Sequence, residues 1–197
     1  MSRTHPSRLL RALFLLLCPL LLASSVTMTA MAAMAADSEH IKKEIPQAHA
    51  LGSGTFRWFG IAVYDAQLWV GKDGYTPEAS GKLGQQPLAL DLTYARSLVG
   101  SKIAEASIEE IQKLKLGTAD QRKIWLEQMR KLFPDVKEGN HITGIFIPAE
   151  AARFYLDGKL LGEIKDADFA NAFFSIWLDK KTTAPDLRQK LLAGSNG

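Results

Sequence analysis

The sequence predicts an α+β domain in which an antiparallel sheet is covered on one face by helices. Three observations lead to this class. Segments rich in β-branched and alternating residues come first, and two amphipathic helical segments follow them. A hairpin signal and further helices then complete the chain. This order of strands, helices, a hairpin and helices is typical of α+β proteins.

The first 35 residues have the three-part pattern of a secretory signal peptide. Arginines precede the apolar run Ala12–Ala23, which is shorter than a membrane span, and a tail of small residues follows it. Ala33–Ala35 fits the A-x-A rule for cleavage after Ala35, with Ala30–Ala32 as a second choice. We therefore expect a periplasmic or secreted protein with no stable membrane insertion after cleavage. The alternative is an uncleaved N-terminal anchor.

Cysteine and charge counts exclude several kinds of site. Cys18 follows three leucines, where a lipidation signal requires a small residue, so we expect a mature chain without lipid, disulfide or cysteine-bound zinc. The full chain has 24 Lys and Arg against 21 Asp and Glu, a net charge of +3. Three arginines and no acids precede Ala36, so the mature chain is balanced. This balance argues against nucleic-acid or anionic-membrane binding through bulk electrostatics.

The mature chain is predicted to begin with an exposed lead-in over residues 36–50, which are polar and contain Pro46. Residues 51–197 are then expected to form a single domain, because a mature chain of roughly 160 residues with ordinary apolar content can bury one core. β-Branched and aromatic residues predict one or two strands over Thr55–Val70. Turn-forming residues predict a loop over Gly71–Pro87.

A further strand and two helices are predicted next. Leu88–Arg96 alternates strictly between two faces, as a strand does. The first helix is expected to stop near Gly117, and the second ends before Pro134. Their apolar stripes consist of Ala104, Ile108, Ile111 and Leu114, and of Trp125, Met129 and Leu132.

The last third of the chain predicts a hairpin and two helices. His141–Pro148 has strand character, and Asp157-Gly158 between two apolar runs is a strong hairpin signal. Asp166 is a suitable N-cap for a helix that is apolar on nearly all sides and should be buried. Pro185 can begin a last short helix.

Common catalytic and metal motifs are missing, so we predict no metal and no cofactor. What remains is a set of arginines and tyrosines within apolar strands. A buried guanidinium needs a partner, and a ligand carboxylate assisted by tyrosine hydroxyls could provide one. The alternative is that the arginines lie at strand ends and reach solvent or a local acid. The set comprises Arg57, Tyr64, Tyr94, Arg96, Arg153 and Tyr155.

Several segments resemble the chalcone isomerase-like family, in its exported bacterial branch. They follow the family's order over most of the mature chain. The resemblance implies an open-faced β-sandwich, in which a large antiparallel sheet lies under a layer of helices with a ligand cleft between them. The segments are Gly52-x-Gly54 with Val63-Tyr64-x-Ala66-x-Leu68-Trp69, Tyr94–Ile111, Ile142–Pro148, Arg153–Ile164, Phe169–Asp179 and Ala184–Leu187.

The polar catalytic residues of plant chalcone isomerases are largely missing from this sequence. The arginine of their G-x-G-x-R pattern falls on Phe56, and Arg57 comes one residue later. A slip of one residue turns a strand side chain to the opposite face unless a bulge restores it. The other polar positions fall on Phe59, Val99 and Ala106, and Ser175 is the one possible hydroxyl match.

Three functional hypotheses follow from the residues and the resemblance. The first is a non-catalytic binder of a hydrophobic small molecule, such as a fatty acid or another carboxylate. The second is an isomerase, an intramolecular lyase acting on a chalcone-like or other enone substrate, and the third is a protein-interaction scaffold. Ring closure needs donors for a developing enolate, so the apolar replacements favour binding. The binder would use Arg57, Tyr94 and Arg96 at its polar end and Trp58, Phe59 and Trp177 as walls, and the enzyme would use Arg57 and Ser175.

Overall fold

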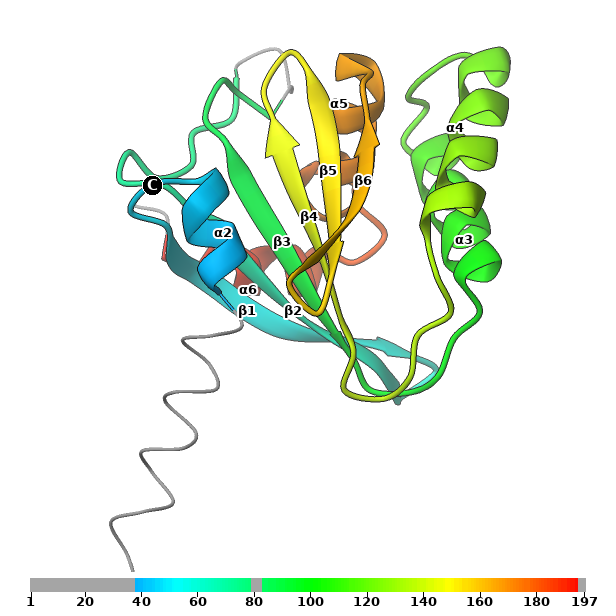
Figure 1. Cartoon of the computed structure of the whole chain (residues 1–197), viewed down its shortest axis with the longest axis horizontal. Coiled ribbons are helices and arrows are strands. Elements are labelled where there is room, and N and C mark those ends of the chain that lie inside the picture. The colour runs from blue at the N-terminus through cyan, green and yellow to red at the C-terminus, as the bar shows by residue number, and fades with distance from the viewer. Residues whose placement is uncertain (1–37, 79–82, 195–197) are drawn as a thin grey trace, which may run out of the picture. The chain divides into compact units, whose positions relative to one another are not determined.

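The computed structural model describes residues 38–78 and 83–194, and within them six strands form one antiparallel sheet in sequential order (Figure 1). The predicted signal peptide lies outside the described residues. The α+β class with a large antiparallel sheet packed against helices is confirmed. The elements are α2 (Glu39–Glu44), β1 (His49–Trp58), β2 (Ile61–Val70), β3 (Leu88–Tyr94), α3 (Gly100–Lys113), α4 (Ala119–Leu132), β4 (His141–Ile147), β5 (Ala151–Leu156), β6 (Lys159–Ile164), α5 (Ala167–Leu178) and α6 (Pro185–Leu191).

Local sequence signals account for most of these boundaries. The Asp166 carboxylate accepts a hydrogen bond from the Phe169 backbone at 2.9 Å and caps α5, while Pro185 opens α6. Asp157 and Gly158 both adopt positive φ between β5 and β6, as a two-residue hairpin turn requires. The predicted strand region before the long loop is a hairpin of two strands, and it begins at His49 rather than near Thr55.

The main core lies between the sheet and α5, on the far side of the sheet in Figure 1. Every second residue of β3 from Leu88 to Tyr94 points into it. From α5, Phe169, Phe173 and Phe174 fill it, as expected for a helix that is apolar all round. Helices α3 and α4 pack side by side and flank α5.

Residues 38–48 are not the exposed lead-in that the sequence predicted. They form α2 and its flanks, which cover the opposite face of the sheet (Figure 1). Ile41 and Ile45, one helical turn apart, are both buried against Ala89 and Ile145. A single turn of helix contains too few residues for a recognisable periodicity, so only the distant partners reveal this contact.

Polar contacts also hold α2 against the sheet. Arg153 Nη1 donates to both carboxylate oxygens of Glu44, at 2.8 and 2.7 Å, and its Nη2 donates to Glu163 at 2.9 Å. The Tyr155 hydroxyl donates to Glu44 at 2.5 Å. The partners of Arg153 are thus acids of this chain, as the alternative interpretation of the strand arginines predicted.

This network predicts how stability depends on pH. Burial acts to raise the pKa of Glu44, but hydrogen bonds from Tyr155 and Arg153 outweigh it and hold that pKa below its ordinary value of 4.5. Folding therefore favours the ionised carboxylate, and its contribution is present above pH 4.5 and lost as pH falls through the lowered pKa. Glu44→Gln should reduce the free energy of unfolding at neutral pH, and this deficit should shrink below pH 4.5.

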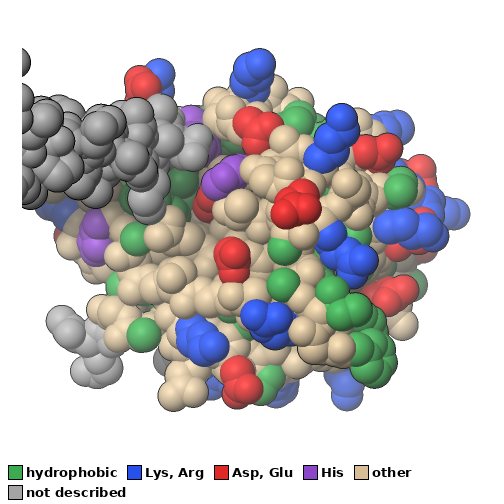
Figure 2. Space-filling view, turned by 90° about the horizontal axis from the view of Figure 1, so that it is seen from below, with side chains coloured by type: hydrophobic (Ala, Val, Ile, Leu, Met, Phe, Trp, Pro, Cys, Tyr) green, Lys and Arg blue, Asp and Glu red, His purple; other side chains and the backbone are tan. Residues whose placement is uncertain are grey.

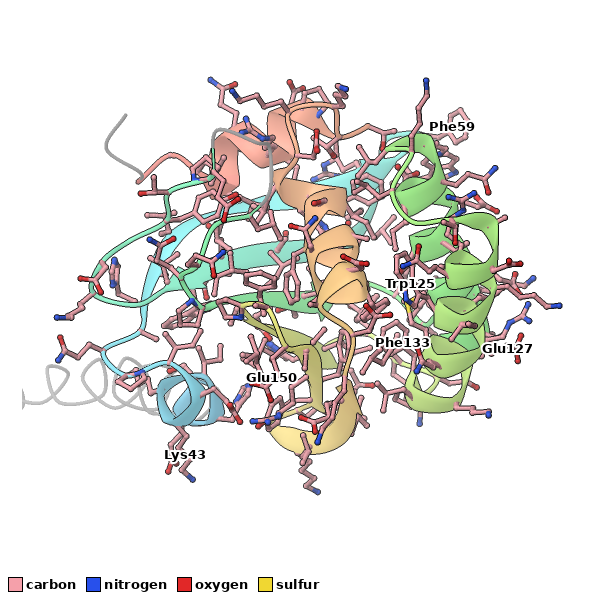
Figure 3. The ribbon with its side chains drawn as sticks, turned by 90° about the horizontal axis from the view of Figure 1, so that it is seen from above. Lys43, Phe59, Trp125, Glu127, Phe133 and Glu150 are labelled. Atoms are coloured by element: carbon pink, nitrogen blue, oxygen red, sulfur yellow. The ribbon has the colours of Figure 1, made fainter. Side chains whose placement is uncertain are left out.

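Urea unfolding of the wild type and of Glu44→Gln, at neutral pH and below pH 4.5, measures this deficit. Glu150→Gln is the matched control, because Glu150 is an exposed carboxylate in the turn between β4 and β5 (Figure 3). A deficit for Glu44→Gln that is the same at both pH values would contradict the assignment.

Candidate functional site

A cleft of about 410 Å³ opens between the sheet and helices α3 and α5. This volume lies within the range of small-molecule sites, and most of the lining is hydrophobic or aromatic, as is usual for such sites. The apolar lining comes from Phe56, Trp58, Val63, Leu92, Leu98, Ile103, Ala106, Phe133, Ile142, Phe173, Ile176, Trp177 and Ala184.

The periodicities of the surrounding elements produce this lining. On β1, Phe56 and Trp58 are two residues apart and therefore share the inner face. On α3, the lining residues recur at helical spacing: Ile103, Ala106 and Glu110 are three and four residues apart. The small side chain of Ala106 leaves room between α3 and the sheet.

Two tyrosines bring hydroxyl groups into the apolar cleft. Tyr64 on β2 and Tyr94 on β3 are directly paired across the sheet, with ring centroids 6.1 Å apart. The Tyr64 oxygen accepts a hydrogen bond from the Trp177 indole at 3.0 Å, so its own proton is available. Within residues 38–78 and 83–194 the Tyr94 hydroxyl makes no hydrogen bond. Burial raises the pKa of both tyrosines, which therefore remain neutral O–H donors at physiological pH.

Charged side chains surround the cleft, and most of them are already paired. Lys113 contacts Glu110 at 2.7 Å, and the Thr183 hydroxyl donates to the same glutamate at 2.6 Å. Lys102 contacts Glu105 at 2.6 Å. Arg96 lines the cleft and is exposed, and it forms no ion pair with the residues that the structure describes. Arg96 is therefore the cation best able to meet an anionic ligand.

Four of the residues that the sequence singled out line this cleft, and three do not. Trp58, Tyr94, Arg96 and Trp177 are brought together around it. Arg57, Phe59 and Ser175 lie outside it, and each of them is a correction to the predicted site.

Arg57 lies on the outer face of β1. Phe56 and Trp58 on either side of it point into the cleft, so strand alternation turns its guanidinium away. A bulge does occur at this point, but its extra residue is Val63 on β2, and it does not reverse β1. Arg57 Nη1 instead donates to the Gly60 carbonyl at 3.3 Å.

The other two corrections also have simple structural causes. Phe59 occupies the turn between β1 and β2, where its side chain is 89% exposed (Figure 3). Ser175 is buried on α5, and its hydroxyl donates to the Asn171 carbonyl one turn earlier in the same helix at 2.7 Å. With Phe56 at the cleft position expected for arginine, the polar set of the plant isomerases is not assembled here.

Sequence reasoning gave too little weight to Tyr64, Phe56 and the α3 face. Tyr64 belonged to the strand set but was not selected for the site. The spacing of Ile103 and Ala106 on α3 could have indicated a cleft-facing stripe, although it is equally typical of a packed helix.

Family and structure comparisons agree with this geometry. Residues 30–193 match the model of a family described as chalcone isomerase-like. The chain belongs to the chalcone isomerase-like family. It is 30% identical over 149 residues to an uncharacterized protein of Haemophilus influenzae, covering 75% of this chain and 70% of the relative.

The fold also resembles the crystal structure of the fatty-acid binding protein AtFAP1 of Arabidopsis thaliana. The TM-score is 0.58 with 14% sequence identity, over 75% of this chain and 87% of the other. At this identity, the likeness concerns the fold alone. Among the described residues, no helix is long and apolar enough to span a bilayer, and no cluster of His, Cys, Asp and Glu could hold a metal ion.

The two cleft tyrosines should differ in their effect on stability. Tyr64→Phe leaves the Trp177 indole N–H without its acceptor and should lower the free energy of unfolding by about 1–3 kcal/mol. Tyr94→Phe removes a hydroxyl that no described residue accepts, so its effect should be under about 1 kcal/mol. Urea unfolding followed by circular dichroism measures both. Equal losses would contradict the assignment of the Tyr64–Trp177 hydrogen bond.

Proposed function

We propose that this protein is exported to the periplasm and binds a hydrophobic carboxylate of the fatty-acid class in its cleft, without turning it over. One observation carries the proposal. Two neighbouring tyrosine hydroxyls with available protons lie in a mainly apolar cleft, and Arg96, which forms no ion pair with a described residue, borders it. An amphiphile with a long apolar part and an acceptor-only head group suits this arrangement.

The hydrogen-bond donors in the cleft favour a carboxylate head group. A carboxylate has acceptor positions and no proton to donate, and both tyrosines offer O–H groups. Hydrogen bonds to a charged group contribute about 1.5–3 kcal/mol each, more than those to a neutral group. Two of the possible acceptors for an amine are already engaged, since the Tyr64 oxygen accepts from Trp177 and Glu110 is held by Lys113 and Thr183. Glu109 is the lining carboxylate that forms no ion pair with a described residue.

The walls suit the apolar part of such a ligand. Burial of an acyl chain contributes about 25 cal/mol for each Å² of apolar surface removed from water. The resemblance in fold to a fatty-acid binding protein supports the same class of ligand. Phe56 and Ala106, which cannot hydrogen-bond through their side chains, favour binding over enone isomerisation.

Mass spectrometry of protein recovered from the periplasm tests export and ligand together. An intact mass beginning at Ala36 is expected if cleavage follows Ala35. Native spectra and organic extraction should reveal a bound fatty acid. An empty cleft, together with no rise in melting temperature on adding fatty acids, would contradict the binding proposal and leave the scaffold hypothesis.

Substitutions on α3 test the location of the site. Ala106→Trp fills the cleft and should abolish fatty-acid binding, whereas Gln112→Trp places the same side chain on an exposed position of the same helix and should not. Tyr94→Phe should weaken binding about tenfold through loss of one charge-assisted hydrogen bond. Displacement of a fluorescent fatty acid measures all three.

The isomerase alternative predicts a different result. Chalcone cyclisation above the uncatalysed rate, lost in Tyr94→Phe and Ala106→Trp but retained in Gln112→Trp, would overturn the non-catalytic proposal.

A further inference from the structure

The turn between β1 and β2 exposes a group of large hydrophobic side chains. Trp58, Phe59 and Ile61 are 60%, 89% and 55% exposed, and together we call them the apolar tip. The rings of Trp58 and Phe59 contact each other in a T-shaped arrangement with centroids 5.0 Å apart. Phe59 projects away from the body of the protein (Figure 3). The other exposed large hydrophobic side chains among the described residues come from three separate segments, and they are Val99, Ile124 and Leu160.

The backbone at the apolar tip has a conformation that a phenylalanine rarely adopts. Phe59 and Gly60 have φ values of 47° and 80°, the left-handed conformation of a tight hairpin turn. Asn followed by Gly is the favoured sequence there, since a bulky side chain costs energy in this conformation. Folding therefore gives no reason for a phenylalanine at this position, and its side chain buries almost nothing in the protein.

Two arginines without ion pairs flank the apolar tip. Arg57 is the one charged residue between Phe56 and Tyr64. Arg96 lies beside the hairpin, because the Ala95 backbone N–H donates to the Val63 carbonyl at 2.9 Å. Neither arginine forms an ion pair with a described residue. Figure 2 shows hydrophobic side chains gathered at the lower right of this face, with Lys and Arg side chains and also an acidic side chain nearby.

The apolar tip is continuous with the mouth of the cleft. Trp58 belongs to both, since it is part of the tip and also lines the cleft. Arg96 lines the cleft as well. An apolar surface therefore runs from Phe59 over Trp58 into the site where we place the acyl chain.

We propose that the apolar tip docks this protein on an anionic phospholipid surface, so that an amphiphilic ligand can pass between bilayer and cleft without crossing water. Docking itself depends only on the tip, whereas the ligand exchange rests on the proposed function. Aromatic side chains beside arginines suit the bilayer interface, where rings enter the boundary and cations meet phosphates. A protruding turn of a few residues is too small for a stable protein interface, which buries more than about 1,000 Å².

Vesicle sedimentation tests the docking. Asp37–Gly197 forms a compact unit with its own core and is the protein to use. It should sediment with phosphatidylglycerol vesicles and less with phosphatidylcholine vesicles. Phe59→Asn, which suits the left-handed turn, should lower the partition coefficient about tenfold, and Phe59→Trp should preserve it. Arg57→Gln should lower it about fivefold on phosphatidylglycerol alone.

Ile124→Asn is the matched control, because Ile124 is 58% exposed on α4 and lies outside the tip. This variant should sediment like wild type, and equal losses in Ile124→Asn and Phe59→Asn would overturn the proposal. A wild-type protein that sediments with neither kind of vesicle would also overturn the proposal. A protein partner that binds the apolar tip more tightly than phosphatidylglycerol vesicles do, and competes with them, would overturn it as well.

Cleft and tip variants separate this inference from the proposed function. Phe59→Asn should bind a fluorescent fatty acid in solution as wild type does, and Ala106→Trp should dock on phosphatidylglycerol as wild type does. A wild-type protein that binds the fatty acid but does not dock on phosphatidylglycerol vesicles refutes the inference alone. A wild-type protein that docks but binds no fatty acid refutes the proposed function and leaves the docking surface standing.

Discussion

The packing of α5 on the sheet determines where the cleft can open. Over β4 the helix lies close, because Gly144 has no side chain and a Cβ there would lie only 3.1 Å from the Phe174 ring. Over β2, the Trp177 indole donates a hydrogen bond to the Tyr64 hydroxyl at 3.0 Å. The helix is thus anchored tightly at one part of the sheet and held at a distance at the other. The cleft occupies the space between these two attachments.

Two similar sequence pairs show what the opposite faces of this sheet do. Tyr94-x-Arg96 and Arg153-x-Tyr155 both place a tyrosine and an arginine two residues apart, the first pair at the end of β3 and the second within β5. On the outer face, Glu44 and Glu163 satisfy Arg153, and Tyr155 donates to Glu44. On the inner face, no described residue provides a carboxylate for Tyr94 or Arg96. The outer pair stabilises the fold, whereas the inner pair has donors left for a ligand.

Much of the fold could be predicted from local sequence signals, such as the Asp166 cap and the Asp157-Gly158 turn, because these act over a few residues. Helix α2 was missed because its contacts are with residues far along the chain. The site was predicted in part: alternation assigns Tyr94 and Arg96 to one face, and it would have assigned Arg57 to the other. Sequence cannot tell whether a face is packed or open, so only the family resemblance marked Ala106 as a position beside the cleft.

The central claim is that a carboxylate lies against the two inner tyrosines with its acyl chain along the cleft. Nuclear Overhauser contacts from dodecanoic acid, labelled with ¹³C at the methylene next to the carboxyl group, test it most directly. The account predicts contacts from this methylene to the ring protons of Tyr64 and Tyr94. Contacts from the terminal methyl group to these rings instead, or contacts with residues outside the cleft, would contradict it.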